Sequence, residues 1–226
     1  MFENFYNDEA LKYLENWGIE KEIEKYLSQT IDNKSKDDLI RIAILFHDLG
    51  KFTQRKINYK DDGSTFFIFK NHEIASANII KSQSFSDWLK DQYFLTDAQI
   101  NYIAQCAGVH YELGKIRDRA NQSDIFLYVK GDQIQKDIQE IMEQNKGFEL
   151  EIGILFLADS LAKTEIHING NNDEDINQKS FLIKEEISKK GLNFTMEKAA
   201  KQMPINIKIA EIYLKTWLEK RSKPII

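Results

Sequence analysis

Histidine is scarce in this chain, and three of its four copies stand at or beside the ends of its more apolar segments. These three are His47, His72 and His110, and the fourth is His167. Imidazole ligates divalent transition metals and also transfers protons near neutral pH. The position of these three residues is therefore the first indication of chemistry in the sequence.

Two carboxylates extend this set. Asp48 follows His47 at the end of an apolar run over residues 39–46, where burial is costly for an acid unless it is paired or binds a cation. Asp159 lies seven residues after Ile152 on a helical apolar stripe, so it shares the side that faces the core. Three imidazoles and two carboxylates form a mixed nitrogen and oxygen set that suits one or two divalent ions, with Mn, Ni, Fe, Mg, Co and Zn all open.

Each of these residues also has a purely structural interpretation. His47 can bond to backbone carbonyls at a helix end, and His110 can be a satisfied core residue on the apolar stripe of its helix. His72 can begin a helix whose dipole Glu73 serves. Five such groups in one chain favour a shared metal site, and Lys51, which follows a glycine turn after Asp48, adds a cation suited to phosphate.

The elements that must position these residues are predicted to be mainly helices. Helical spacing favours two short helices on either side of Gly18, a buried helix over 37–49, and helices over 71–82, 96–110, 132–145, 149–165, 178–190 and 204–220. Thr96 and Gln99 form a capping box at the start of one of them. Residues 52–70 are predicted to be a loop with a short β-hairpin near 60–70, and 115–119 and 169–177 are predicted to be surface loops.

Composition limits the classes that fit. The chain has 226 residues, 42% of them hydrophobic, a formal charge of −5, and the single cysteine Cys106. One cysteine excludes an internal disulfide framework and a cysteine-rich zinc site. No apolar run approaches the roughly 20 residues that span a bilayer, and the N-terminus lacks a signal-peptide pattern. We expect a cytoplasmic all-α protein without membrane contact, and the negative charge argues against a long nucleic acid as partner.

Two segments together resemble a known family. The run Leu45-Phe46-His47-Asp48-Leu49-Gly50-Lys51 looks like the signature of the HD-domain metal-dependent phosphohydrolases. The later run Phe69-Lys70-Asn71-His72-Glu73-Ile74-Ala75-Ser76-Ala77 is similar to a segment of the HD domains associated with tRNA nucleotidyltransferases and poly(A) polymerases. The resemblance covers residues 38–165. It implies an HD helical bundle over 1–170, with 171–226 as a helical extension packed on the same domain.

The resemblance also implies roles for particular residues. The implied metal ligands are His47, Asp48, His72, His110 and Asp159, with Asp48 able to bridge two ions. Lys51 would contact the scissile phosphate or orient the carboxylates, and Glu73 or Asp159 would handle a proton. Apart from the resemblance, the basic stretch of Lys115, Arg117 and Arg119 after His110 is interpreted as a phosphate-binding rim or as an ordinary solvated loop. Family members usually carry a further histidine on an earlier helix. This chain has none before His47, so either Glu15, Asn16 or Glu20 takes its place or one metal position is weak or empty.

The resulting prediction is a metal-dependent phosphoric ester hydrolase, a phosphatase or phosphodiesterase. Its substrate would be a small phosphorylated molecule, a nucleotide or an RNA end, attacked by a metal-activated water. Two alternatives stay open: a nuclease of the CRISPR-associated HD type, and a degenerate HD domain that acts as a nucleotide-binding or regulatory module. No motif for nucleotide addition is present, and the sequence leaves the oligomeric state undecided.

Overall fold

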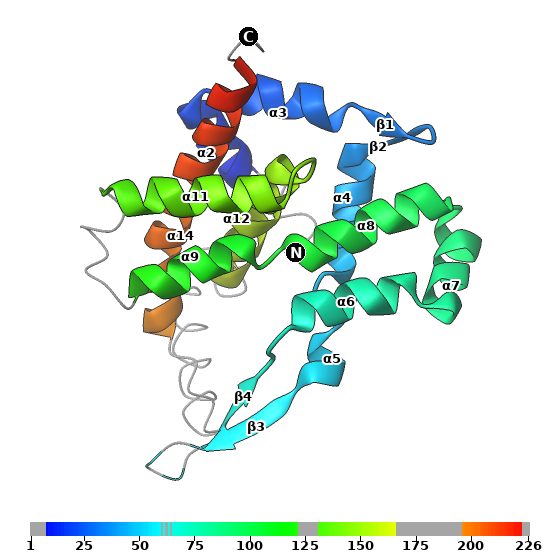
Figure 1. Ribbon diagram of the computed structural model, residues 1–226, viewed down its shortest axis with the longest axis horizontal. Helices are drawn as coiled ribbons and strands as arrows, with labels where there is room; N and C mark the ends of the chain where they lie inside the picture. Colours follow the sequence, from blue (N-terminus) through cyan, green and yellow to red (C-terminus); the bar gives the residue numbers. More distant parts are fainter. Residues whose placement is uncertain are drawn as a thin grey trace, which may run out of the picture.

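Helices form most of the chain, and two short hairpins interrupt them (Figure 1). The computed structural model describes residues 8–59, 61, 63, 65–121, 131–165 and 196–222. Its elements are α2 Asp8–Trp17, α3 Glu20–Leu27, β1 Thr30–Ile31, β2 Lys34–Ser35, α4 Lys36–Phe46, α5 Lys51–Gln54, β3 Lys56–Tyr59, β4 Thr65–Ile68, α6 His72–Lys81, α7 Gln83–Tyr93, α8 Asp97–Val109, α9 Glu112–Asn121, α11 Asp132–Gln144, α12 Glu149–Glu165 and α14 Met196–Ser222. The predicted all-α class with a short hairpin is confirmed.

Helix α4 lies at the centre of the bundle and packs on α8, which in turn packs on α6. Ser35 caps α4 by accepting a hydrogen bond from the Asp38 backbone N–H (3.1 Å). Leu39, Ile40, Ala43 and Ile44 of this helix are buried, as its apolar sequence predicts. The expectation that the helix is buried all round is wrong at Leu45, which is 46% exposed.

The capping box at the start of α8 is confirmed and has a second use. Gln99 donates its side-chain amide to the backbone carbonyls of Ile31 (2.8 Å) and Asp32 (3.0 Å). The same residue accepts from the Thr96 backbone N–H (2.9 Å). One buried amide therefore fixes both the start of α8 and the hairpin β1–β2, which the sequence did not signal.

Three predicted features need correction. Residues 115–119 are not a loop but part of α9, because Leu113 and Ile116 are buried one turn apart and make that segment amphipathic. Residues 83–93 form α7, which the sequence did not signal. Asn71 precedes α6 as expected, yet it has φ +60° and its side chain makes no capping hydrogen bond.

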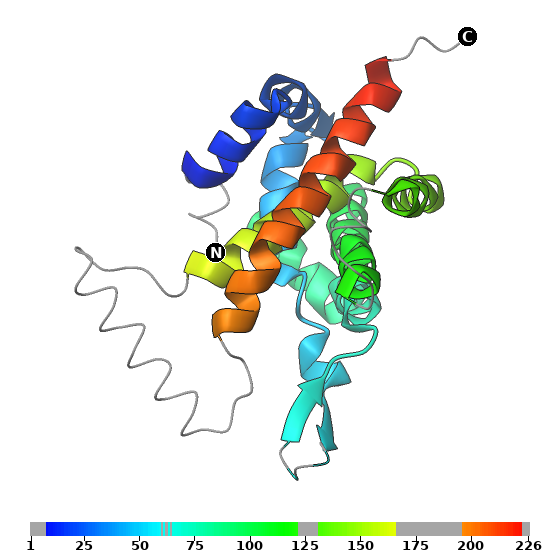
Figure 2. The ribbon, with the colours of Figure 1, turned by 90° about the vertical axis from the view of Figure 1, so that its left-hand side faces the viewer.

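Of the remaining predicted elements, some are confirmed and others lie outside the described residues. The hairpin β3–β4 is antiparallel and pairs Lys56 with Ile68 and Tyr59 with Thr65, so it begins a few residues earlier than expected. Helix α14 contains the predicted 204–220 helix and runs along α12 (Figure 2). The segments 169–177 and 178–190 lie outside the described residues, and the boundary at residue 171 stays a prediction. Among the described helices, none combines the length and apolarity that crossing a membrane requires.

A buried carboxylate on α12 joins four helices. Glu151 is fully buried, and its Oε1 accepts hydrogen bonds from the hydroxyls of Tyr102 on α8 (2.7 Å) and Tyr26 on α3 (2.9 Å). Lys36 on α4 places its ammonium 3.7 Å from the same oxygen. These contacts compensate for the desolvation of the charge, so Glu151 is a structural acid of the core.

This network predicts unequal effects for two buried tyrosines. Tyr102→Phe removes a hydrogen bond to a buried charge and is expected to lower the free energy of unfolding by about 2 kcal/mol. Tyr213→Phe is the matched control, because the buried Tyr213 hydroxyl has no hydrogen-bond partner among the described residues. Urea unfolding should show that Tyr213→Phe is neutral or stabilising. Equal losses for the two variants would contradict this account of Glu151.

Candidate metal centre

The centre begins at the C-terminal end of α4, where the chain turns from His47 toward α5. Gly50 lies against the first turn of α6, and a Cβ at this position would overlap the carbonyl oxygen of His72 and crowd the backbone N–H of Ser76. Only glycine permits this approach. The turn therefore brings the His47-Asp48 pair beside His72, which is 25 residues further along the sequence.

Ser76 fastens this contact. Its hydroxyl accepts a hydrogen bond from the backbone N–H of Gly50 (2.8 Å) and donates one to the carbonyl of His72 (2.8 Å). The Ser76 side chain is fully buried, so both bonds are shielded from water. The serine of the second motif thus holds the glycine of the first, a relation that neither motif reveals alone.

All three histidines of the site orient their rings in the same way. Each Nδ1 faces the backbone carbonyl three residues earlier: His47 on Ile44 (2.7 Å), His72 on Phe69 (2.8 Å) and His110 on Ala107 (2.6 Å). A carbonyl oxygen only accepts, so these contacts assign the ring proton to Nδ1. Each Nε2 then carries a lone pair, which is the arrangement of a metal-ligating imidazole.

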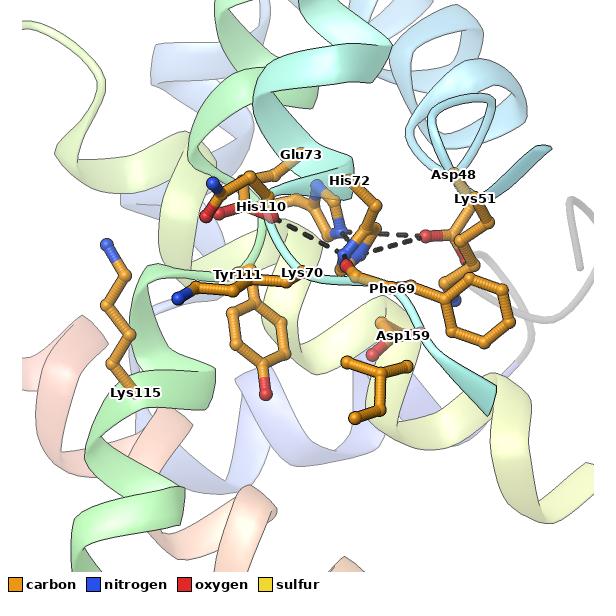
Figure 3. Close-up of a pocket in the computed structure, with 12 residues that line it drawn as sticks. Asp48, Lys51, Phe69, Lys70, His72, Glu73, His110, Tyr111, Lys115 and Asp159 are labelled. Atoms are coloured by element: carbon orange, nitrogen blue, oxygen red, sulfur yellow. Dashed lines mark hydrogen bonds and ion pairs between the residues drawn. The ribbon is translucent and has the colours of Figure 1, made fainter. Parts of the chain in front are cut away.

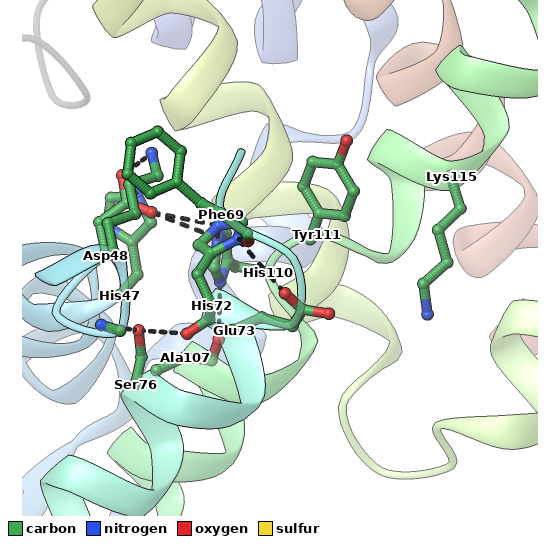
Figure 4. A network of polar contacts seen from close by, with 12 residues as sticks. His47, Asp48, Phe69, His72, Glu73, Ser76, Ala107, His110, Tyr111 and Lys115 are labelled. Atoms are coloured by element: carbon green, nitrogen blue, oxygen red, sulfur yellow. Dashed lines mark hydrogen bonds and ion pairs between the residues drawn. The ribbon is translucent and has the colours of Figure 1, made fainter. Parts of the chain in front are cut away.

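The three Nε2 atoms converge on Asp48 (Figure 4). One carboxylate oxygen, Oδ1, lies 3.3 Å from His72 Nε2 and 3.7 Å from His110 Nε2, and the other, Oδ2, lies 3.3 Å from His47 Nε2. The ligand atoms of His47, Asp48 and His110 all lie within 4.8 Å of one another. His72 joins this group, since its Nε2 is 3.2 Å from that of His110.

The donor set fits a divalent cation. His47 Nε2 and Asp48 Oδ1 are buried and have no hydrogen-bond partner among the described residues. Two imidazole nitrogens that both carry lone pairs repel each other at the His72–His110 distance. A cation bound between these atoms would give the unpaired groups a partner and remove the repulsion between the two nitrogens. Unpaired polar atoms and this repulsion are both costly where little water is present.

The pKa values of Asp48 and His110 favour metal binding, whereas the pKa of His47 is raised, which favours its protonated ring. Burial and the charge of neighbouring His47 lower the pKa of His110 to about 4. Burial alone would raise the pKa of the Asp48 carboxyl, but the imidazoles of His47 and His72 and the ammonium of Lys51 hold it well below its usual range. Burial lowers the pKa of His47, yet the Asp48 carboxylate outweighs it and raises that pKa. Asp48 is therefore ionised and His110 neutral at pH 7, as metal ligands must be.

A pocket of about 500 Å³ opens beside these ligands (Figure 3). Its lining residues are Asp48, Lys51, Ile68, Phe69, Lys70, Asn71, His72, Glu73, His110, Tyr111, Lys115 and Asp159. Lys51 binds Asp48 Oδ2 (2.5 Å), and Lys115 lies on the opposite side of the histidines. The metal ligands thus face a space large enough for a small molecule.

A comparison with protein-family models adds to this geometry. The HD domain model matches residues 12–164, which is more than half of the chain. The chain belongs to the HD domain family. HD domains are generally metal-dependent hydrolases, and the cluster of His47, Asp48 and His110 is compatible with that chemistry. No significant match was found among curated proteins or among solved structures.

The HD centre gathers most of the predicted site residues. Asp159 on α12 lines the pocket and is half-buried, but it lies outside the tight group of His47, Asp48 and His110. Its negative charge nevertheless acts on His47. Glu73 is buried beside His72, with its Oε2 3.4 Å from His72 Nδ1. These two acids therefore flank the ligands on different helices.

Other predicted residues point elsewhere. Arg117 pairs with Asp118 (2.9 Å) and Arg119 with Asp137 (3.1 Å), and neither arginine lines the pocket. The expected basic rim is therefore reduced to Lys115, because a helix sends successive side chains in different directions.

The candidates for the missing upstream histidine also lie outside the pocket. Glu15 and Asn16 are exposed on α2, and Glu20 begins α3. Helices α2 and α3 contribute no residue to the lining of the pocket. His167 lies outside the described residues.

Five lining residues of the pocket had no site role in the sequence prediction: Ile68, Phe69, Lys70, Asn71 and Tyr111. Tyr111 follows His110 directly, and its hydroxyl donates to Asp118 (2.7 Å) and accepts from Arg117 (3.0 Å). Lys70 is the second residue of the Phe69–Ala77 segment, two residues before His72. Closeness in sequence to a ligand was the signal available for both residues.

Metal binding is expected to depend on Asp48. At a Mn²⁺ concentration of about 100 times the dissociation constant, the ion should stabilise the wild-type HD domain by about 2.7 kcal/mol. Asp48→Ala should abolish this stabilisation, whereas Asp91→Ala, which removes an exposed carboxylate from α7, should retain it. Thermal unfolding with Mn²⁺ and with EDTA measures both. An unchanged Mn²⁺ effect in Asp48→Ala would exclude this centre.

Ser76 should influence the metal without ligating it. Ser76→Ala leaves the buried Gly50 N–H unpaired, so we expect a loss of about 1–3 kcal/mol in unfolding free energy. We also expect metal affinity to fall by roughly tenfold, since the variant loosens the turn that positions Asp48. Ser84→Ala, at an exposed position on α7, is the control. Identical metal affinities in calorimetric titrations of the two variants would refute the positioning role.

Proposed function

We propose that this HD domain hydrolyses a phosphate ester of a nucleotide or of an RNA end. The observation that carries the proposal is the convergence of three imidazole lone pairs and Asp48 beside a pocket that also contains lysines. Transition-metal ligands next to cations suit an anionic substrate whose electrophilic centre must be activated. Phosphate esters have both properties.

The cations of the pocket come from three elements. Lys51 lies on α5, Lys70 precedes α6, and Lys115 lies on α9. Lys51 holds Asp48 Oδ2, so its ammonium lies beside the ligand cluster, where charge develops on the phosphoryl oxygens. Lys115 pairs with Glu112 (2.6 Å) on the far side of the pocket. We assign Lys51 to the reacting phosphate and Lys115 to a second anionic group of the substrate.

Two acids complete the chemistry. A divalent ion in this centre supplies Lewis-acid polarisation and a water of lowered pKa. Glu73 lies in the pocket next to His72, and Asp159 enters it from α12. We assign to one of these carboxylates the acceptance of the proton that the attacking water loses and its delivery to the leaving oxygen. Tyr111 and Phe69 line the same pocket and offer ring surfaces to a base or ribose.

The substrate class rests on the second sequence motif. The segment from Phe69 to Ala77 is similar to HD domains that accompany tRNA nucleotidyltransferases, which favours a nucleotide or an RNA end, such as a 2′- or 3′-phosphate or a 2′,3′-cyclic phosphate. A degenerate HD domain that binds nucleotides without hydrolysis is the second candidate. The absence of a histidine before His47, together with the exposure of Glu15 and Asn16, favours it.

The test is an assay of phosphate esters with Mn²⁺, Ni²⁺ or Mg²⁺. The panel contains mononucleotides, 2′,3′-cyclic nucleotides, end-phosphorylated RNA and circular single-stranded DNA. Hydrolysis of a nucleotide or RNA-end ester supports the proposal. Cleavage of the circle without action on mononucleotides would favour the nuclease, and a metal-loaded protein inactive on every substrate would favour the binding module.

Substitution of Lys51 is expected to lower turnover more than substitution of a lysine that also pairs with an aspartate but lies outside the pocket. Lys51→Ala removes a charge beside the reacting phosphate, so kcat/KM is expected to fall about 100-fold or more. Lys90→Ala is the matched control, because Lys90 also pairs with an aspartate, Asp97 (2.7 Å), but outside the pocket. Steady-state kinetics on the best ester measures both. Equal rates for the two variants would remove Lys51 from the mechanism.

A further inference from the structure

The hairpin β3–β4 extends away from the helices (Figures 1 and 2). Among the described residues, large apolar side chains are exposed at nine positions, and five of these lie between residues 52 and 68. They are Phe52, Ile57, Tyr59, Phe67 and Ile68. Exposed apolar side chains gathered on one small element indicate a binding surface.

Strand alternation divides these side chains between two faces. Ile57 pairs with Phe67 and Tyr59 with Thr65, so these residues share one face, which we call the Tyr59 face. On it, Tyr59 is 72% exposed and Ile57 58%. The guanidinium of Arg55 stacks over the Phe67 ring at 3.7 Å from its centre. A cation and aromatic rings thus form one surface.

The Tyr59 face continues into the metal pocket. The Phe67 and Phe69 rings lie 6.4 Å apart, and Phe69 lines the pocket beneath Lys51, whose ammonium is 6.0 Å from the ring centre. Lys51 in turn binds Asp48. Ring surfaces and cations therefore follow one another from the hairpin to the candidate ligands, and Figure 3 shows the last part of this series, Phe69, Lys51 and Asp48.

Charge identifies the kind of partner. Residues 51–70 contain five basic and two acidic side chains, a net charge of +3 in a chain whose net charge is −5. Alternating aromatic and basic side chains are the means by which proteins bind single-stranded nucleic acids without sequence preference. The strand from Phe69 to Thr65, the cross-strand partner of Tyr59, is roughly 13 Å long at about 3.3 Å per residue. A single nucleotide has one base and cannot stack on both Phe69 and Tyr59.

We propose that the Tyr59 face binds single-stranded nucleic acid and directs its end into the metal pocket. Bases stack on Tyr59 and on the Arg55–Phe67 pair, and the phosphate at the end of the strand contacts Lys51. The delivery of an end to the pocket rests on the proposed function, whereas the binding of the strand does not. The substrate class is thereby narrowed from nucleotides in general to the ends of single strands.

The test measures binding apart from hydrolysis. The probe is a fluorescein-labelled RNA of about 10 nucleotides, a length within the usual range of single-strand sites. Anisotropy is recorded in EDTA on the Asp48→Ala background, so that no cleavage occurs. Tyr59→Ala and Phe67→Ala are each expected to weaken binding by about tenfold or more. Tyr59→Phe retains the ring and should bind normally, as should Phe94→Ala, which removes an exposed aromatic ring from the end of α7.

Each outcome tests the binding of single-stranded nucleic acid independently of the proposed hydrolysis. Loss of RNA binding in Tyr59→Ala but not in Phe94→Ala supports it, even if the wild type hydrolyses no ester. Equal RNA binding by these two variants overturns it, even if mononucleotides are hydrolysed. Retention by phosphatidylserine vesicles without RNA binding also overturns it, because the Tyr59 face would then be a membrane-contacting surface. Circular dichroism of each variant confirms that the fold is intact.

Discussion

The close approach of Gly50 to the first turn of α6 is the constraint on which the metal centre depends. It requires the absence of a side chain at Gly50 and the hydroxyl of Ser76, which links the two backbones. Asp48 then lies within 3.3 Å of His72 Nε2. The centre is thus assembled by contact between backbones, and its ligands need no long flexible side chains to reach one another.

Ring orientation is the second part of this pre-organisation. The ends of α4 and α8 place the carbonyl three residues earlier within reach of Nδ1 in His47 and His110, and the turn before α6 does the same for His72. All three rings therefore direct a lone pair toward Asp48. The result is a group of electron-rich atoms with buried, unpaired members. Asp48 is only partly buried and lines the pocket, whereas Glu151 is fully buried and its Oε1 receives two hydroxyl donors. The contrast separates a structural carboxylate from one that is available to a cation.

The chain is acidic overall but contains a segment with an excess of positive charge. The −5 total led to the expectation that a long nucleic acid is excluded, yet residues 51–70 carry +3 on the hairpin and its flanks. Electrostatic attraction to phosphate acts over about 8–10 Å at physiological salt, so the local charge matters more than the sum. A short single strand is compatible with both values.

The sequence by itself determined the helical class, the capping box at Thr96 and Gln99, and the short list of chemical groups, because these depend on local periodicity and on residue types. The prediction of a basic loop at residues 115–119 was wrong, because burial of Leu113 and Ile116 stabilises a helix there. Nothing in the sequence indicated that Arg117 and Arg119 pair with aspartates outside the pocket. Only the tertiary structure brought Gly50 against Ser76 and three distant imidazoles around Asp48. Contacts between residues far apart in sequence arise from packing, and no spacing along the chain specifies them.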